Sequence, residues 1–363
     1  MTEKIQFFLP GPSYVTEAAR QAMTKPMVGH RSAPFKNFYL SIAERLPKVL
    51  RTAGDGIVAS GSSTLIMESA VISCVRSEVL NLVNGAFSER WHGISKSVGR
   101  SADKIDFPWG EAVDSDVIRA ALRRKKYDAV TVVHNETSTG VMSPLADIAK
   151  AIREESDALI LVDTVSSLGG APIETDAWGL DVVLAGGQKA LALPPGIAVF
   201  SFSDRAAERA AQVQHRGFYT DLLRYRDKHR EGGNITTPAI PLIYALDVQL
   251  DAILAEGMEA RWARHEALQK RTAAWAAERG IEYASAPDAR SLTVSCLKPP
   301  AGVDPQSIVK KLAERGWTIG GGYGDWKPST FRIGHMGEVR MSDLDALLAE
   351  IDSILDGLDG IRP

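Results

Sequence analysis

The chain has 363 residues, of which 45% are hydrophobic and 24% charged, and its 42 Lys and Arg against 45 Asp and Glu give a formal net charge of −3. This composition is typical of a globular protein with a full hydrophobic core and argues against intrinsic disorder. The near-neutral charge argues against a protein that binds nucleic acid or an anionic membrane surface. The two cysteines, Cys74 and Cys296, are too few for a disulfide scaffold or a cysteine-rich metal centre.

Targeting signals are absent from the sequence as read. No apolar run approaches the roughly 18 residues that a membrane helix needs, and the apolar stretch at residues 5–10 is too short for a signal peptide. We therefore expect a cytoplasmic protein, which also suits the small number of cysteines. The seven histidines show no metal-ligand spacing, so the sequence predicts no metal site.

Up to about residue 240, short apolar runs alternate with helix-like stretches such as 117–126 and 148–155. The apolar runs predict strands at 57–59, 79–83, 129–133, 159–162, 182–185 and 196–200. Near-continuous runs of β-branched residues are typical of strands buried on both faces, hence of a mostly parallel sheet covered by helices. The fold class that we predict is therefore α/β.

After residue 240 the pattern changes. A long helical stretch covers 244–279, with Gly257 as a possible break. The remaining sequence predicts strands at 291–297, 317–319 and 331–333 and helices at 305–315 and 342–358. These elements indicate a smaller α+β domain that the long helix joins to the large one. We expect an N-terminal segment at 1–20, a large domain at 21–255 and a small C-terminal domain at 256–363.

Polar residues follow the predicted strands directly, at the edge where parallel sheets bind ligands. The set consists of Ser62, Ser63, Thr64, Thr137, Asp163 and Lys189. The loop 60–64 lies between a strand and a helix start, so its N–H groups and hydroxyls favour a phosphate; the simpler alternative is a helix cap. It lacks the spacing of a P-loop.

Asp163 and Lys189 are the two charged members of this set. A carboxylate at the end of an apolar strand is costly unless it meets a cation, although an isolated Asp more often caps a loop. A lysine flanked by glycines and apolar residues is a candidate for a Schiff base, because desolvation lowers its pKa; the alternative is a solvated loop lysine.

These residues resemble the class V aminotransferases, which are fold-type-I enzymes that use pyridoxal 5′-phosphate (PLP). The resemblance rests on Asp163-Thr164-Val165-Ser166-Ser167-Leu168-Gly169-Gly170 and, 26 residues after Asp163, on the lysine of Gly187-Gln188-Lys189-Ala190. It also includes Pro10-Gly11-Pro12, Gly29-His30-Arg31, Asn84-Gly85-Ala86-Phe87, the stretch 134–141 and Phe331-Arg332-Ile333-Gly334. The stretches 134–137 and 176–182 look most like the serine–glyoxylate and alanine–glyoxylate branch.

The resemblance implies a role for each matching residue. Lys189 would hold PLP as a Schiff base and then carry a proton, and Asp163 would pair with the pyridine nitrogen. Positions that match phosphate contacts are Ser62, Ser63, Thr64 and Gln188. Thr137 matches the partner of the ring hydroxyl, and Phe87 matches the aromatic that stacks on the ring, although a core Phe is the simpler reading.

Two further positions match residues that bind the substrate and the neighbouring subunit. Arg332 matches the arginine that clamps the substrate carboxylate, which the guanidinium fork suits; its alternative is a surface ion pair. Thr236 matches a residue that reaches the phosphate of the neighbouring subunit, so the resemblance implies a homodimer with active sites at the interface. Some relatives have a Tyr three residues earlier, where this chain has Gly233.

The resemblance implies an aminotransferase that moves an amino group from serine or alanine to glyoxylate or pyruvate by a ping-pong mechanism. The alternatives are a 2-aminoethylphosphonate–pyruvate aminotransferase, a PLP-dependent lyase or epimerase, and a non-catalytic α/β binding protein. A cysteine desulfurase is disfavoured because Cys74 and Cys296 lie in apolar runs that predict core positions. His134 and His335 fall near the expected site, and we expect both to be structural.

Overall fold

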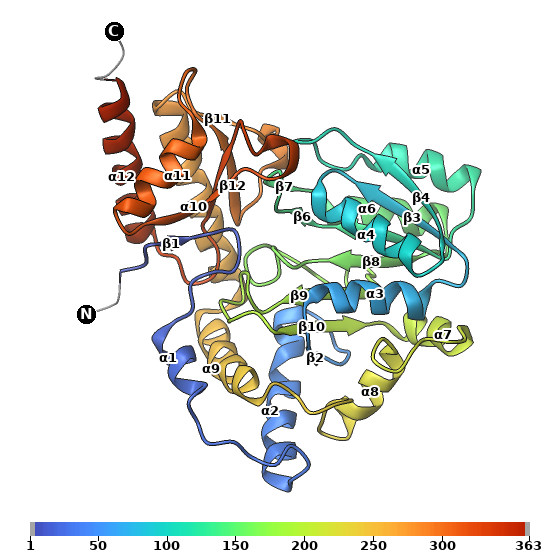
Figure 1. Ribbon diagram of the computed structural model, residues 1–363. Helices are drawn as coiled ribbons and strands as arrows, with labels where there is room; N and C mark the ends of the chain where they lie inside the picture. Colours follow the sequence, from blue (N-terminus) through green and yellow to red (C-terminus); the bar gives the residue numbers. More distant parts are fainter. Residues whose placement is uncertain (1–3, 360–363) are drawn as a thin grey trace.

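Two β-sheets organise the chain, one of seven strands and one of five (Figure 1). The computed structural model describes residues 4–359. None of the helices in this range is both long enough and apolar enough to cross a membrane. The seven-stranded sheet is built from residues before about 203 and the five-stranded sheet mainly from residues after 281. The expected α/β fold with a mostly parallel central sheet and a smaller C-terminal α+β part is thereby confirmed.

The large sheet is parallel except for one strand. Its spatial order is β2 (Ile57–Ser60), β10 (Ile197–Phe202), β9 (Val182–Gly186), β8 (Leu159–Asp163), β5 (Ala129–Val133), β3 (Glu78–Val83) and β4 (Ser101–Asp106). Strand β10 runs antiparallel to both of its neighbours. The carboxyl ends of all the other strands therefore meet at one edge.

Helices cover both faces of the large sheet, because successive residues of a strand point to opposite faces. In β8, Leu159 and Leu161 pack on one face and Ile160 and Val162 on the other. The first face is covered by α3 (Ser63–Cys74), α4 (Ala86–Ser97), α7 (Asp204–Gln212) and α8 (Leu222–Arg230). The second is covered by α1 (Glu17–Ala22), α2 (Ala33–Leu50), α5 (Ser115–Arg124), α6 (Leu145–Glu155) and α9 (Ile240–Glu256).

The small sheet takes one edge strand from the start of the chain. Its order is β1 (Phe7–Phe8), β13 (Thr318–Gly321), β14 (Phe331–Gly334), β12 (Val294–Lys298) and β11 (Glu282–Tyr283). It packs against α10 (Met258–Glu278), α11 (Pro305–Glu314) and α12 (Met341–Asp359) around a separate apolar core. Strand β1 pairs in parallel with β13, so the N-terminal segment belongs to this sheet in space (Figure 1).

The structure refines two sequence-based boundaries. The predicted long helix is divided into α9 and α10 at Gly257, whose φ of +83° ends the first helix. The strand expected from residue 291 begins only at Val294, because the Ser291 hydroxyl accepts hydrogen bonds from the N–H groups of Thr293 and Val294 and forms a turn.

Several short elements complete the fold. A two-stranded ribbon, β6 (Asn135–Glu136) and β7 (Val141–Met142), follows β5. Two 3₁₀ turns lie in the small domain, η1 (Pro287–Ala289) and η2 (Gly324–Trp326). The ribbon stands between the large sheet and the small domain (Figure 1), since Val141 bridges to Arg290 and Asn135 donates a hydrogen bond to Thr293.

Candidate active site

The predicted site residues lie at one edge of the large sheet, as their position in the sequence indicated. Asp163 ends β8, Phe87 follows β3, Thr137 follows β5 and Lys189 follows β9. Gly61 and Ser62 connect β2 to the start of α3 at the same edge. These are carboxyl ends of parallel strands, the usual place of a ligand in an open α/β sheet.

Lys189 is buried rather than a solvated loop lysine: 9% of it is exposed. Its Nζ donates a hydrogen bond to the backbone oxygen of Pro10, and the Ser13 hydroxyl donates to the backbone oxygen of Lys189 at 2.7 Å. A Cβ added to Gly11 would stand 2.4 Å from Nζ, so only glycine lets the N-terminal segment pass this close. Burial, helped by Arg332, lowers the pKa of Lys189 from 10.5 to about 8.

Asp163 is buried in the same cluster. Its Oδ1 accepts a hydrogen bond of 2.7 Å from the N–H of Val165, which is the loop contact expected of an isolated Asp. Burial nevertheless raises the pKa of its carboxyl from 3.8 to about 7, and the charge of Glu136 acts in the same direction. Lys189 opposes this rise, as Asp163 opposes the fall in the pKa of Lys189. The acid and the amine therefore lie near enough for each to affect the pKa of the other.

Two aromatic rings form a wall beside the amine. The Phe87 and Tyr323 ring centroids are 5.4 Å apart with an interplanar angle of 34°, and the Lys189 Nζ lies 5.9 Å from the Phe87 centroid. Phe87 is half-buried, so it is not simply a core residue. The guanidinium of Arg332 lies 5.4 Å from the Tyr323 centroid. Lys189, Phe87, Tyr323 and Arg332 thus lie next to one another in one cluster.

Arg332 is buried on β14, and its hydrogen bonds go to backbone oxygens. Its Nε donates to Gly321 at 2.8 Å and its Nη1 donates to Thr137 at 3.0 Å, while 8% of the residue is exposed. Within residues 4–359 it forms no ion pair, so the surface ion pair considered from the sequence is wrong. The bond to Thr137 joins the small sheet to the edge of the large one. Thr137 in turn has its Oγ1 2.5 Å from the Ser166 Oγ.

The loop at the start of α3 forms a small polar cradle. Ser62 occupies the N-cap position, yet its exposed side chain makes no capping hydrogen bond. Ser63 is 6% exposed, and its Oγ has no hydrogen-bond partner in the described part of the chain. A Cβ on Gly186 would stand 2.4 Å from that Oγ and 2.6 Å from the Gln188 Oε1. These three residues therefore converge, and Thr64 stands half-buried beside them.

Thr236 does not share a cavity with the other predicted site residues, although Asn234 and Ala239 on either side of it bond to β2. It lines a separate cavity of about 390 Å³ whose other walls include His30, Arg31 and Lys36, but no residue of the α3 loop and not Lys189. Gly233, which stands at the position of the relatives' Tyr, lines the same cavity. The structure of one chain therefore brings together all the predicted site residues except Thr236.

Comparison with known proteins identifies the family. Residues 63–347 match the sequence model described as aminotransferase class V. The chain is a class V aminotransferase. It is 38% identical over 96% of its length to an uncharacterized aminotransferase of Methanocaldococcus jannaschii (92% of that protein), and 33% identical over 98% to the serine–glyoxylate aminotransferase of Methylorubrum extorquens (92%). The alanine–glyoxylate aminotransferase of Nostoc sp. superposes with a TM-score of 0.91 at 31% identity, over 98% of this chain and 96% of the other.

The sequence-based prediction of the site missed two residues that the structure places there. Glu136 is fully buried beside the cluster, and Tyr323 faces Phe87. Glu136 follows a predicted strand closely, so the argument made for Asp163, that a carboxylate there is costly, applied to it equally. Tyr323 lies between glycines in an irregular segment, and no local pattern marks it.

Both histidines near the site of the aminotransferase are structural. The Nδ1 of His134 lies 3.0 Å from the Ser167 Oγ, and the Nε2 of His335 lies 2.9 Å from the Ser295 Oγ. Both rings are buried, and burial lowers the pKa of each from 6.5 to about 4. They are therefore neutral at physiological pH and hold neighbouring loops.

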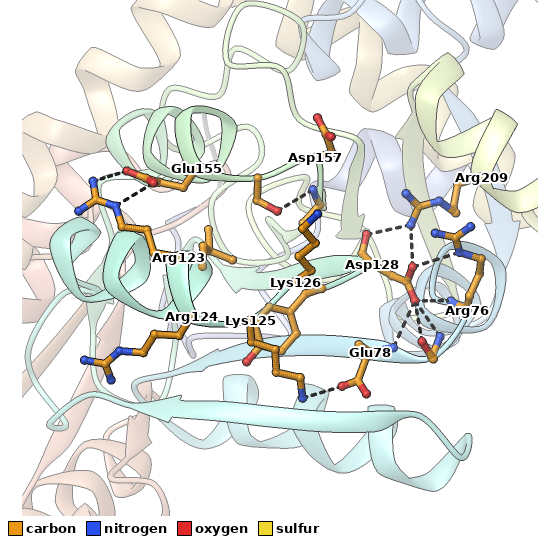
Figure 2. Close-up of a pocket in the computed structure, with 15 residues that line it drawn as sticks. Arg76, Glu78, Arg123, Arg124, Lys125, Lys126, Asp128, Glu155, Asp157 and Arg209 are labelled. Atoms are coloured by element: carbon orange, nitrogen blue, oxygen red, sulfur yellow. Dashed lines mark hydrogen bonds and ion pairs between the residues drawn. The ribbon is translucent and has the colours of Figure 1, made fainter.

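A different cavity, of about 880 Å³, lies at the opposite edge of the large sheet of this aminotransferase (Figure 2). Its charged side chains mostly bind one another: Arg123 pairs with Glu155, Lys125 with Glu78, and both Arg76 and Arg209 with Asp128. The Asp128 carboxylate also accepts hydrogen bonds from the N–H groups of residues 76–78, at the start of β3. This network ties the strand starts together and does not resemble a substrate site.

Proposed function

We propose that this class V aminotransferase binds PLP at the Lys189 cluster and moves an amino group from a small amino acid, serine or alanine, to a small 2-oxo acid, glyoxylate or pyruvate. The observation that carries the proposal is the shared burial of the Lys189 amine and the Asp163 carboxyl, with Arg332 beside them. The Methylorubrum and Nostoc proteins are both glyoxylate aminotransferases by name, which supports the choice of acceptor.

The residues present fit PLP. The unpartnered Ser63 hydroxyl and the space that a Gly186 side chain would fill suit a phosphate oxygen, and the start of α3 adds backbone N–H groups. We propose that the phosphate is held by Ser62, Ser63, Thr64 and Gln188. Phe87 offers a ring for stacking, and Thr137 a hydroxyl for the ring oxygen. When bound, PLP supplies an electron sink for the negative charge that develops at the substrate Cα.

Lys189 would both hold the cofactor and move the proton of the substrate Cα. With a pKa of about 8, a substantial fraction of its amines is neutral near pH 8, and a neutral amine is the nucleophilic and basic form. A group whose pKa lies near the working pH serves as both acceptor and donor of a proton. Its position beside Phe87 keeps Nζ on one defined side of the stacking ring.

Asp163 would hold a proton on the ring nitrogen of the cofactor. Its carboxylate is costly in this buried place, as its raised pKa shows, and a cationic pyridinium offsets that cost. The one hydrogen bond from Val165 fixes the carboxyl through Oδ1. The residue thus stabilises the charged form of the ring.

Arg332 and Tyr323 would select the substrate. The two backbone bonds of Arg332 hold its guanidinium in place and leave Nη2 for a carboxylate. Tyr323 stands close to Phe87 and is carried by a turn that packs on the large domain, where the Trp109 and Trp326 centroids are 5.5 Å apart. A fixed aromatic wall close to the arginine favours substrates with short side chains. Because the donor and the acceptor would use the same site in turn, we expect ping-pong kinetics.

We further propose a homodimer in which Thr236 serves the active site of the partner subunit. The cavity that Thr236 lines also contains the cations Arg31 and Lys36, which suit a phosphate arriving from outside this chain. A dimer would bring that phosphate to Thr236, which one chain alone does not do.

The cysteines bear on both the chemistry and the compartment. Cys74 and Cys296 are buried and free, and burial raises the pKa of both thiols, that of Cys296 to about 11. Neither can serve as the exposed, reactive thiolate of a desulfurase. Free thiols are typical of a reducing compartment, which supports a cytoplasmic protein.

A panel of donors and acceptors tests the proposed function. Purified protein loaded with PLP should be yellow, and serine or alanine should bleach the colour in the absence of an acceptor, with glyoxylate or pyruvate restoring it. A protein that turns over 2-aminoethylphosphonate faster than either amino acid would instead be the phosphonate aminotransferase, since Arg332 suits either anion. Turnover without any 2-oxo acid would indicate a lyase or epimerase.

A further inference from the structure

Glu136 is a buried carboxylate to which we have assigned no role so far. It lies on β6 and is 0% exposed. Its Oε2 accepts hydrogen bonds from the Ser88 N–H at 2.9 Å, the Phe87 N–H at 3.1 Å and the Ser88 hydroxyl at 3.1 Å. Its Oε1 lies 2.6 Å from the Ser138 hydroxyl and 3.2 Å from the Ser138 N–H. Both oxygens act as acceptors, which is the pattern of an ionised carboxylate.

These bonds fix the first turn of α4. The N–H groups of Phe87 and Ser88 bind Glu136, and that of Ala86 binds the Ser138 Oγ at 3.1 Å. The first N–H groups of a helix have no partner within the helix, so an outside carboxylate determines where this turn lies. A Cβ on Gly85 would stand 2.3 Å from the Glu136 Cγ, so the glycine is what admits the side chain.

The same carboxylate contributes to the charge balance of the site. Among the charged groups that act on the Lys189 amine are Arg332, Asp163, Glu136 and Arg90. Glu136, Arg90 and Lys189 act in turn on Asp163. Glu136 and Asp163 favour the protonated amine, whereas Arg332 and Arg90 oppose it. Glu136 differs from Asp163 in its surroundings, because both of its carboxylate oxygens accept several hydrogen bonds.

We propose that Glu136 is a positioning residue, whose carboxylate holds Phe87 beside the Lys189 amine through the first turn of α4 and provides a fixed negative charge on that side of the cluster. The proposal rests on the function proposed above in taking Phe87 and Lys189 as the residues that hold PLP. Glu136 itself acts through its neighbours, because its side-chain hydrogen bonds in the described part of the chain go to Phe87, Ser88 and Ser138.

Three variants separate the charge of Glu136 from its geometry. Glu136→Gln removes the charge at nearly constant shape. Glu136→Asp keeps the charge and shortens the side chain, and Ser138→Ala keeps the charge and removes one bound hydroxyl. Ser97→Ala is the matched control, because Ser97 lies at the exposed end of the same helix and bonds only to Ile94 in the described structure.

The first measurement needs no cofactor. Acetic anhydride labels neutral amines, so mass spectrometry of the peptide that contains Lys189 gives its labelling midpoint against pH. We expect a midpoint near pH 8 in the unchanged protein, Ser138→Ala and Ser97→Ala. Glu136→Gln should lower it by at least about 0.5 unit, because a nearby opposite charge favours the charged form. Glu136→Asp should keep most of the original value.

The second measurement is the affinity of the cofactor-free protein for PLP, followed by the quenching of tryptophan fluorescence. We expect Glu136→Gln, Glu136→Asp and Ser138→Ala each to weaken binding about 5- to 20-fold, the effect of a lost charge-assisted hydrogen bond. An unchanged midpoint and unchanged affinity in Glu136→Gln, with only a lower melting temperature, would reduce Glu136 to a structural cap and overturn the proposal. If Glu136→Gln does not fold, unchanged PLP affinity in both other variants overturns it.

Each of the two proposals can be refuted independently of the other. An unchanged protein that neither binds PLP nor transaminates would refute the proposed function. The labelling midpoint of Lys189 would still decide whether Glu136 sets the charge that this amine faces, because that measurement involves neither PLP nor substrate.

Discussion

Gly186 faces the hydroxyl of Ser63 so closely that a Cβ on the glycine would stand 2.4 Å from that Oγ. The Gln188 Oε1 would be 2.6 Å from the same Cβ. Real Cβ atoms do not approach oxygen so closely, so the three residues enclose a space that only the absence of a side chain keeps open. The space lies between the end of β9 and the start of α3, where an anion is favoured.

Gly186→Ala should therefore fill the phosphate cradle. We expect the affinity for PLP to fall about 10- to 100-fold, because the methyl displaces Ser63 or Gln188 and removes their hydrogen bonds. Fluorescence titration of the cofactor-free protein measures this. Gly93→Ala is the control, since Gly93 is exposed on α4 and an added Cβ would meet nothing within 4 Å. Equal PLP affinity in the two variants would contradict the placement of the phosphate.

Lys189→Ala should abolish transamination while leaving the fold intact. The variant loses the amine that would carry the proton, a contribution of about 10²–10⁴ in rate, together with the anchor of the cofactor. Steady-state turnover and circular dichroism measure the two expectations. The matched control is Lys126→Ala, at the exposed opposite edge of the sheet (Figure 2), which should retain full activity. Persistent turnover in Lys189→Ala would refute the assignment.

Asp163→Asn should stabilise the cofactor-free protein and inactivate the enzyme. The pKa of Asp163 is raised to about 7 in the folded chain, so the folded state binds this proton more tightly than the unfolded one. The carboxyl therefore costs stability increasingly as the pH rises from about 4 to 7, and the cost is constant above that. At pH 8 its removal should raise the free energy of unfolding by about 2–4 kcal/mol.

Urea unfolding at pH 4.5 and pH 8 measures the effect of Asp163→Asn, which should be smaller at the lower pH. The Asn retains an oxygen for the Val165 N–H. Asp116→Asn serves as the control, because the Asp116 side chain is 95% exposed. Equal stabilisation at both pH values would show that the buried charge is not its cause.

Arg332→Lys should weaken substrate binding more than it slows the chemical step. Lysine keeps the positive charge. It has too few N–H groups in the right geometry to bond to the backbone oxygens of Gly321 and Thr137 and also to both oxygens of a carboxylate. We expect KM for the amino acid and for the 2-oxo acid to rise about 10- to 100-fold, the worth of a charge-assisted bidentate bond. Initial-rate kinetics with both substrates test this. Arg315→Lys, at an exposed ion pair, should leave both KM values unchanged.

The sequence predicted the site residues that follow strands of the large sheet better than those that other parts of the chain contribute. Asp163 and Lys189 could be found because a charged residue after an apolar run stands out locally. Tyr323 could not, because its place depends on a turn of the small domain that packs on Trp109. Glu136, like Asp163, is an acidic residue close to the end of an apolar strand, so it could have been predicted. It was missed because only Thr137 of that motif was matched to a role.

The antiparallel direction of β10 could also have been predicted from the sequence. Parallel neighbours need a crossover of a dozen or more residues, usually with a helix. Only ten residues separate the end of β9 at Gly186 from Ile197, and they contain Pro194 and Pro195, so β10 had to run antiparallel. Strand β1, by contrast, is two residues long and pairs with Thr318 and Ile319, which no local pattern could indicate.

That pairing has a consequence for the order in which the nascent chain matures. Phe7 and Phe8 are synthesised more than three hundred residues before their partner strand. Pro10, whose backbone oxygen accepts a hydrogen bond from the Lys189 amine, lies two residues after this strand, so the strand that anchors it is paired only once β13 has been made. A deletion of residues 7–10 would therefore remove both an edge strand of the small sheet and the backbone oxygen that binds the Lys189 amine.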